Sequence, residues 1–323
     1  MVVAAVDPRR VGPALCLFSA ACFGAMAIFG KLAYEAGVSP EALLLLRFTM
    51  AALLLGALLA LRPGSRRPPP PAPGTGGGGS VRRLVLTGLG LGAIGYATQA
   101  TLYFGALDRI DASLVALVLY TYPAMVTVAA VLLGRDRLTP ARSAALVAAS
   151  GGTLLVLLGA GGGRFDRVGV GLAFGAALTY TVYILVADTA VHRLPPVVLS
   201  ALVMTGAALA LGVRAVGSGG VDLGFGPGGW FWIGCIAVVS TVAATLAFFA
   251  GLRRTGPSTA SILSTFEPVV TTALAAVTLG EFLTPLQLAG GLLVLSSVVV
   301  VQLRPRSRST VAAPAGRPAA VGT

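Results

Sequence analysis

Long apolar runs recur from one end of the chain to the other, and they constrain its fold more than any other feature. An α-helix rises 1.5 Å per residue, so about 20 apolar residues cross the roughly 30 Å hydrocarbon core of a bilayer. The chain is 56% apolar and only 11% charged, whereas soluble domains carry about 25% charged residues. A soluble fold would lack a hydrophilic surface, so the sequence predicts an all-α membrane protein.

The runs divide the chain into about ten predicted transmembrane helices. Most connections are short, so consecutive helices are expected to be antiparallel neighbours. The run after Arg9 and Arg10 is too long for the apolar region of a signal peptide, and we expect it to be a retained first span. Segments 62–80 and 304–323 are rich in Pro, Gly or Arg, which predicts disorder. The predicted spans are 12–33, 41–61, 84–106, 112–133, 141–160, 168–188, 196–213, 229–250, 258–279 and 285–303.

The placement of charge predicts the orientation of the chain and argues against a nucleic-acid partner. The net charge is +12, yet of the 23 basic residues only Lys31 and Arg47 fall inside apolar runs. The others lie at the ends of the runs without interleaved aromatic residues, so no nucleic-acid binding is expected. Arginines concentrate between alternate spans, and the positive-inside rule then places both termini in the cytoplasm. The expected location is the cytoplasmic membrane.

Residue types that hold metals or cofactors are scarce in this sequence. Cys16, Cys22 and Cys235 lie in apolar runs without CxxC spacing, and His192 is the single histidine. We therefore expect no metal and no cofactor. The HExxH, GxSxG and Walker A motifs are absent from the sequence, so no catalytic residue and no enzymatic activity is predicted.

The chain also repeats itself. At a constant offset of 145 residues, Arg109 matches Arg254 and Pro123 matches Pro268. Alanine and leucine matches carry little weight in so apolar a chain, but matches of Pro, Arg, Ser and Thr at one offset indicate a duplication. Further matches are Ser113 with Ser258, Thr127 with Thr272, Leu138-Thr139-Pro140 with Leu283-Thr284-Pro285 and, at an offset of 156, Pro40 with Pro196.

The repeat predicts two related units, residues 12–160 and residues 168–303, each with five spans. Because five is odd, the two units must enter the membrane from opposite sides. The charges agree, since Asp108-Arg109-Ile110-Asp111 lies on the predicted outer side and the matching Arg253-Arg254 lies on the inner side. Two inverted five-helix repeats that meet at a site near mid-membrane are a recurrent architecture of transporters.

The two units also carry a set of short motifs, namely Leu46-Arg47-Phe48, Gly105-Ala106-Leu107, Pro123, Phe266-Glu267-Pro268, Leu279-Gly280-Glu281, Leu283-Thr284 and Gly290-Gly291. Together these motifs resemble the EamA-type members of the drug/metabolite transporter superfamily. The resemblance covers roughly residues 12–303 and implies a ten-helix fold that moves metabolites, often outward, without implying a substrate. One departure is Gly134-Arg135-Asp136, which stands where the second copy has the family's Gly-Glu signature.

Glu267 is the residue that most invites a functional explanation. It lies about ten residues into a predicted span, and a charge at the centre of a membrane helix costs about 2.5–3.5 kcal/mol on insertion scales. We hypothesise that it binds a proton or a cationic group of a substrate; a structural carboxyl is the alternative. Arg47 lies at a depth from which it could pair with Glu267, or it could extend toward the outer surface. Lys31 is interpreted as an anchor at the outer surface.

Other candidate residues gather around two matched prolines. Pro123 and Pro268 are predicted to kink spans four and nine, either to shape a site or for packing alone. Aromatic and hydroxyl groups suit a cavity for a small solute, although membrane hydroxyls often bond to their own helix. The pairs Gly88/Gly92 and Gly171/Gly175 have the spacing of closely packed helices. The candidate binding residues are Glu267, Arg47, Tyr120, Tyr122, Gln99, Tyr103, Tyr180, Tyr183 and Ser264.

These features together favour a secondary transporter that moves a small metabolite or drug-like solute by alternating access, with export as the preferred direction. The expected partners are the solute, the lipid bilayer and a proton carried by Glu267. A channel or scaffold subunit remains an alternative, and a membrane-embedded enzyme for lipid-linked substrates is a weaker one. Substrate and oligomeric state are not predicted.

Overall fold

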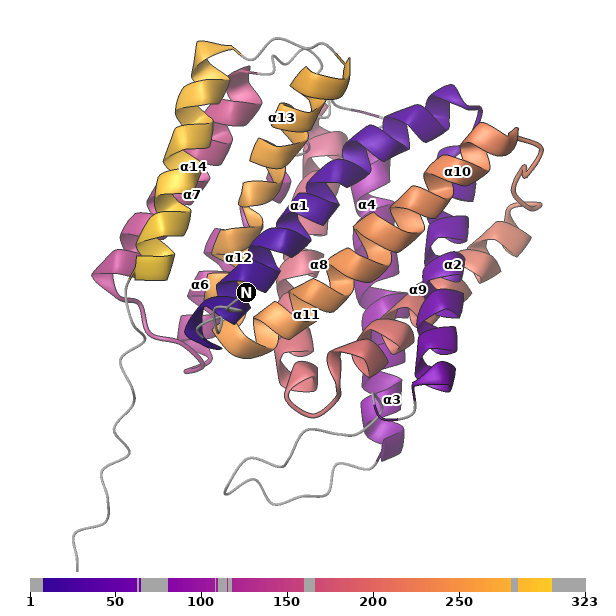
Figure 1. The fold of residues 1–323 in the computed structure, drawn as a ribbon, viewed down its shortest axis with the longest axis horizontal. Coiled ribbons are helices and arrows are strands. Elements are labelled where there is room, and N and C mark those ends of the chain that lie inside the picture. Colours follow the sequence, from indigo (N-terminus) through magenta and orange to yellow (C-terminus); the bar gives the residue numbers. More distant parts are fainter. Residues whose placement is uncertain are drawn as a thin grey trace, which may run out of the picture.

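The computed structural model describes residues 8–62, 64, 81–107, 109, 115, 118–159, 166–279 and 284–303, and within them it contains helices and no strand. Figure 1 shows a bundle of long helices, most of which run roughly side by side. The helical segments are α1 (Pro8–Glu35), α2 (Pro40–Leu61), α3 (Val81–Gly90), η2 (Leu91–Tyr96), α4 (Ala97–Leu107), α6 (Tyr122–Leu132), α7 (Pro140–Gly159), α8 (Arg167–Val191), α9 (Pro196–Gly217), α10 (Pro227–Cys235), η3 (Ile236–Ala243), α11 (Ala244–Thr255), α12 (Pro257–Ser264), α13 (Phe266–Leu279) and α14 (Pro285–Leu303).

Local sequence signals set the ends of these helices. Ser39 caps α2 by accepting a hydrogen bond from the Ala42 backbone N–H at 3.2 Å, and Pro40 follows as the first helical residue. Asp166 caps α8, and the backbone N–H groups of Val168 and Gly169 hold the pKa of its carboxyl below the ordinary value. The turn between α1 and α2 is short, so these two helices are antiparallel neighbours.

Six helical stretches are long and apolar enough to cross a membrane. Two shorter apolar helices, Tyr122–Leu132 and Pro285–Ser297, lie between or beyond them. The chain is therefore an all-helical membrane protein, while a count of ten spans stays a prediction. The predicted span 112–133 falls partly outside the described residues. Both predicted disordered segments also fall outside the described residues, apart from Arg62 and Gly64. The six stretches are Val11–Glu35, Pro40–Leu61, Arg167–Val191, Pro196–Gly217, Pro227–Thr255 and Pro257–Thr278.

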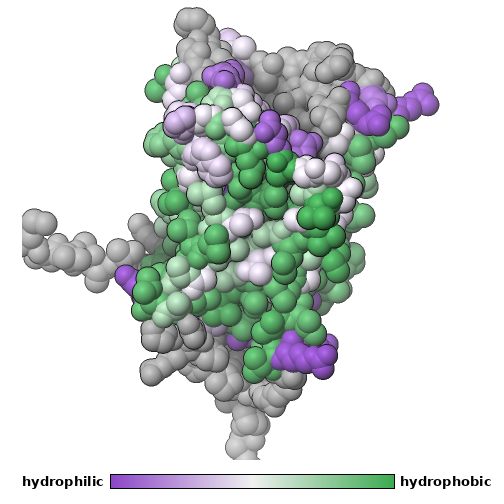
Figure 2. All heavy atoms as spheres, turned by 90° about the vertical axis from the view of Figure 1, so that its right-hand side faces the viewer, coloured by the Kyte–Doolittle hydropathy of each residue, from purple (hydrophilic) through white to green (hydrophobic). Residues whose placement is uncertain are grey.

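The outer surface of the bundle is apolar where a soluble protein would be polar. Val213 and Val216 of α9 expose 74% and 82% of their surface, and Leu292 of α14 exposes 69%. Apolar patches of this extent mark contact with another apolar phase. Figure 2 shows a broad apolar band across one face, with hydrophilic residues toward its two ends. This band has the distribution expected of a lipid-facing surface.

Helices from distant parts of the chain pack against each other in a regular order. α7 packs against α14, and Figure 1 shows this pair at one side of the bundle. α2 packs against α9, α1 packs along α11 and α13, and α8 packs along α4 and α6. Two long helices also contain a π-helical segment, η2 between α3 and α4 and η3 between α10 and α11. The packing leaves α1 and α8 in contact with helices on several sides.

Two glycines bring η2 and α9 into backbone contact. A methyl group added to Gly92 would collide with the carbonyl oxygen of Val203, and one added to Gly206 would collide with that of Leu89. Gly88 also confirms the predicted close packing, since an added Cβ would lie 2.8 Å from Leu202. The same prediction is not borne out at Gly171, because no described residue would lie within 4 Å of an added Cβ.

Replacing Gly92 by alanine should therefore destabilise the protein, whereas Gly171→Ala should not. Alanine is the better helix former by about 1 kcal/mol at either position, but overpacking at Gly92 costs about 1–3 kcal/mol. Melting temperatures of the two variants in detergent, followed by tryptophan fluorescence, measure the difference. Equal melting temperatures would contradict the contact between η2 and α9.

Candidate functional site

The tyrosines of this protein gather at one place inside the bundle. Six of the seven in the sequence form a group, which we call the tyrosine cluster. Adjacent rings lie close together: Tyr96 and Tyr183 have centroids 5.6 Å apart, and Tyr180 and Tyr122 are 4.7 Å apart. Stacked and edge-on aromatic contacts at such distances stabilise one another. The tyrosine cluster comprises Tyr96, Tyr103, Tyr120, Tyr122, Tyr180 and Tyr183.

Glu267 lies against this cluster. Its carboxylate accepts a hydrogen bond from the Tyr120 hydroxyl, and it lies close enough to Tyr103 and Tyr122 to interact with both electrostatically. Glu267 is half-buried, as are Tyr103, Tyr120 and Tyr180. These four side chains therefore keep part of their surface exposed, although they lie among helices on several sides.

The helix break at Thr265 determines where Glu267 stands. Pro268 has no N–H to donate to the carbonyl of Ser264, four residues earlier, and its ring would clash with that carbonyl. The helix accordingly ends at Ser264 and restarts as α13 at Phe266, with Glu267 in the first turn. A carboxylate in the first turn of a helix interacts favourably with the unpaired N–H groups there.

Both predicted kinks are thus helix interruptions with the proline in the first turn of the next segment. Pro123 occupies this position in α6, which begins at Tyr122. Sequence reasoning located the two sites but not the form of the break. The serine and threonine hydroxyls near these breaks bond within their own helix: Ser264 donates to the Ala260 carbonyl at 2.9 Å, and Thr265 donates to Ile262 at 2.6 Å. The Ser264 side chain also forms a hydrogen bond with the Tyr122 side chain.

A glycine on α1 allows α13 to approach closely beside Glu267. A Cβ added to Gly24 would lie 2.9 Å from the carbonyl oxygen of Glu267 and 3.0 Å from the side chain of Val270. The hydroxyl of Thr271 donates to the Gly24 carbonyl at 3.0 Å. The backbone of α13 at Glu267 is therefore fixed against α1 at one defined level.

Arg47 approaches the opposite part of the tyrosine cluster. It is 4% exposed, and its Nη1 contacts the sulfur of Met26 at 2.8 Å while its Nη2 donates to the Tyr96 hydroxyl at 3.4 Å. The hypothesis of a direct pair with Glu267 is wrong in this structure, because no ion pair joins these two described residues. Tyr96 accepts the hydrogen bond from Arg47 and interacts electrostatically with both charges.

Tyr96 is the site residue that sequence reasoning missed. It precedes Gln99 by three residues and Tyr103 by seven, and this spacing places all three on one helix face. This helical spacing is the sequence signal that identifies Tyr96 as a member of the site. Gln99 is half-buried, like Tyr103. Lys31, near the end of α1, is exposed.

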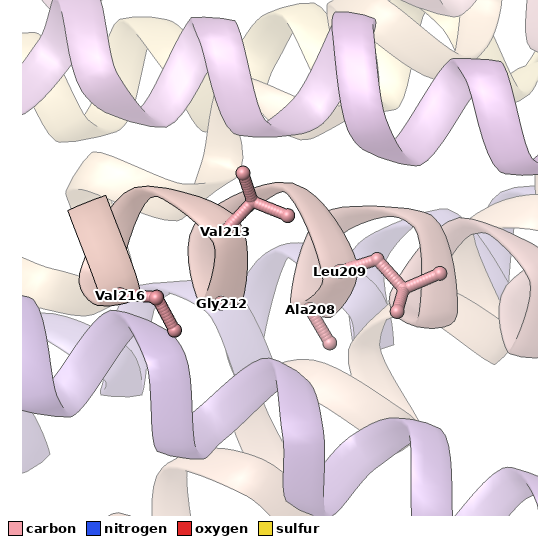
Figure 3. Close-up of a pocket in the computed structure, with 5 residues that line it drawn as sticks. All are labelled: Ala208, Leu209, Gly212, Val213 and Val216. Carbon is pink, nitrogen blue, oxygen red and sulfur yellow. The ribbon is translucent and has the colours of Figure 1, made fainter. Parts of the chain in front are cut away.

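The groove in Figure 3 is a different feature from the tyrosine cluster. It has a volume of about 370 Å³, and the described residues that line it all belong to α9. None of these five side chains offers a polar group, and Val213 and Val216 are among the most exposed apolar residues. We interpret it as part of the lipid-facing surface. The lining residues are Ala208, Leu209, Gly212, Val213 and Val216.

Known proteins match this chain over most of its length. The model of the EamA-like transporter family matches residues 10–158 and again residues 167–303. The uncharacterized transporter YcbK of Bacillus subtilis (strain 168) is 26% identical over 292 residues, which cover 88% of this chain and 90% of that protein. An uncharacterized transporter of Archaeoglobus fulgidus is 28% identical over 217 residues, or 66% of this chain and 75% of the relative.

A solved crystal structure shares the fold. It is 19% identical in sequence, with a TM-score of 0.74 over 90% of this chain and 98% of that one. The family match confirms the resemblance drawn from the short motifs. Because the family model covers most of the sequence and the relatives are named transporters, this chain is a multi-pass membrane protein that belongs to the EamA-like transporter family.

Proposed function

We propose that the protein is a secondary transporter that moves a small solute across the cytoplasmic membrane by alternating access, with the tyrosine cluster and Glu267 as its binding site. The observation that carries the proposal is a half-buried carboxylate beside buried and half-buried tyrosines inside an apolar bundle. Ionisable residues inside membrane proteins mark pathways for substrates and ions. Aromatic rings bind a small solute through their faces and leave it free to depart.

The residues of this site come from both halves of the chain, as alternating access requires. Tyr96 and Tyr122 belong to the first half, whereas Tyr180, Tyr183 and Glu267 belong to the second. A solute bound among them would touch both halves. Relative movement of the halves would then expose it first to one side of the membrane and then to the other.

The helix contacts support two halves that are related by an inverted two-fold axis. The packing of α1 on α11 has its counterpart in that of α8 on α4, and α1 on α13 corresponds to α8 on α6. The pairs α2 with α9 and α7 with α14 map onto themselves. The π-helical segments begin at Leu91 and Ile236, which are 145 residues apart like the repeat itself. The family model also matches twice.

Export of the solute and coupling of its transport to a proton are also part of the proposal. The carboxylate of Glu267 is the group that would carry the proton, because it is half-buried and accepts a hydrogen bond from a neutral tyrosine hydroxyl. We propose no enzymatic role. A channel would lack saturation and counterflow, and a scaffold subunit would show no flux.

The inverted arrangement predicts that the first loop of each half faces a different side of the membrane. In a variant with Cys16, Cys22 and Cys235 replaced by alanine, Glu41→Cys and Arg193→Cys each introduce one thiol at an exposed position. A membrane-impermeant maleimide added to intact cells should label the Glu41→Cys variant. It should label the Arg193→Cys variant only after the membrane is permeabilised. Labelling of both from one side would contradict the inverted topology.

Neutralising Glu267 should abolish coupled transport while leaving the fold intact. The solute is first identified by comparing metabolites inside and outside cells that lack or overproduce the protein, and its counterflow is then measured in proteoliposomes. Glu267→Gln keeps the size of the side chain and its ability to accept from Tyr120, so we expect a loss of transport of about tenfold or more without a change in melting temperature. The matched control is Glu41→Gln, at the surface. An unchanged rate and an unchanged pH profile for Glu267→Gln would refute the role of the carboxylate.

A further inference from the structure

Arg47 is a buried cation for which the described residues provide almost no compensation. A guanidinium carries five N–H donors and cannot lose its charge in a protein. Among the described residues, its Nε has no hydrogen-bond partner. Its other two contacts are weak, because the Met26 sulfur is a poor acceptor and the Tyr96 oxygen is 3.4 Å away. This arginine is 4% exposed, so solvent does not take the place of the missing acceptors.

Aromatic faces supply part of the attraction that a carboxylate would otherwise give. The guanidinium carbon lies 4.4 Å from the centroid of Phe48 and 6.0 Å from that of Tyr96. Such contacts stabilise a cation but leave its in-plane N–H donors available. The donors therefore remain suited to an anionic group whose two oxygens accept parallel hydrogen bonds, such as a carboxylate or a phosphate.

Arg47 and Glu267 also lie at the same level of the bundle. Arg47 contacts Met26, and Glu267 packs against Gly24, two residues earlier on α1. Two residues of helix correspond to about 3 Å of rise. The unsatisfied cation therefore borders the tyrosine cluster at the depth of the proposed binding site.

We infer that Arg47 binds an anionic group, a carboxylate or a phosphate, and that the transported solute is an organic anion with an unsaturated or apolar body. The anionic group would take the free donors of Arg47 and the body would lie on the rings of the tyrosine cluster. This inference rests on the proposed function, since it names the class of solute for that site. Glu267 stands away from Arg47, so it does not occupy the position of the anion.

Binding of three aromatic probes that differ in charge tests the inference without any measurement of flux. Benzoate, benzamide and benzylamine have similar size and are anionic, neutral and cationic. With the purified full-length protein in a neutral detergent, we expect benzoate to raise the melting temperature most. Arg47→Gln should weaken benzoate binding by about tenfold or more, as expected for the loss of a hydrogen-bonded charge pair. The control Arg214→Gln, at an exposed arginine, should bind benzoate like the natural protein.

A second variant separates a binding role from a structural one. Arg47→Met removes a buried charge that lacks a counter-ion, so we expect its melting temperature without ligand to equal or exceed that of the natural protein, with no response to benzoate. A large drop in melting temperature for Arg47→Met would show that the arginine holds the fold, and would overturn the inference. Equal binding of all three probes by the natural protein would overturn it even if neither variant folds.

The anion could also be a lipid headgroup, and bilayer nanodiscs distinguish the two sources. In phosphatidylcholine nanodiscs, added phosphatidylglycerol should leave benzoate binding unchanged if the site takes a soluble anion. Competition by phosphatidylglycerol that is lost in Arg47→Gln would assign the same donors to a lipid phosphate and overturn the claim of a transported anion. If none of the three probes binds, the inference of an anion site is overturned. The counterflow result for Glu267→Gln tests the proposed transport function independently of that outcome.

Discussion

Hydrocarbon offers no hydrogen-bond partner to a backbone amide, and the whole structure follows from this constraint. A chain in the bilayer must satisfy its N–H and C=O groups within itself, which leaves the helix as the form of every apolar run here. Among the described residues, departures from regular helix include η2, η3 and the break at Thr265. These three lie where other helices pack: η2 against α9, η3 against α1, and the Thr265 break between α12 and α13, beside α1. Neighbouring helices therefore surround the irregular backbone at these three places.

The interruptions of the helices determine where two of the candidate functional side chains lie. Tyr96 ends one π-helical segment, and Glu267 begins the helix after the proline break. A straight helix could bury these side chains only against other side chains, whereas a broken one adds unpaired backbone donors next to the carboxylate. Arg47 comes from the regular helix α2. It contacts Met26 of α1 and Tyr96 of η2, and the contact with Tyr96 joins it to the tyrosine cluster.

Sequence reasoning could locate the helices because hydrocarbon thickness sets their length, and it could locate the prolines because their chemistry is local. It placed Glu267 deeper in the membrane than Arg47 but within reach of it, and offered a direct pair or an extension of Arg47 toward the outer surface. The structure contains no such pair, because contact between two helices also depends on packing angles that no periodicity encodes. The two glycine pairs make the same point: at identical spacing, Gly92 is in backbone contact with α9, whereas no described residue lies within 4 Å of a Cβ added to Gly171.

In the proposed inverted repeat, Tyr122 and Glu267 occupy matching positions, and the two residues interact in the same cluster. Residues beside a two-fold axis meet their own equivalents, so an antiparallel homodimer of one half would carry the same side chain at both places. Two glutamates there would repel each other, and two tyrosines would supply no carboxylate. Joining two such halves into one chain removes that restriction, because each position can then differ on its own. In chemical terms, the proposed duplication would permit a single acid to stand beside the axis that relates the two halves.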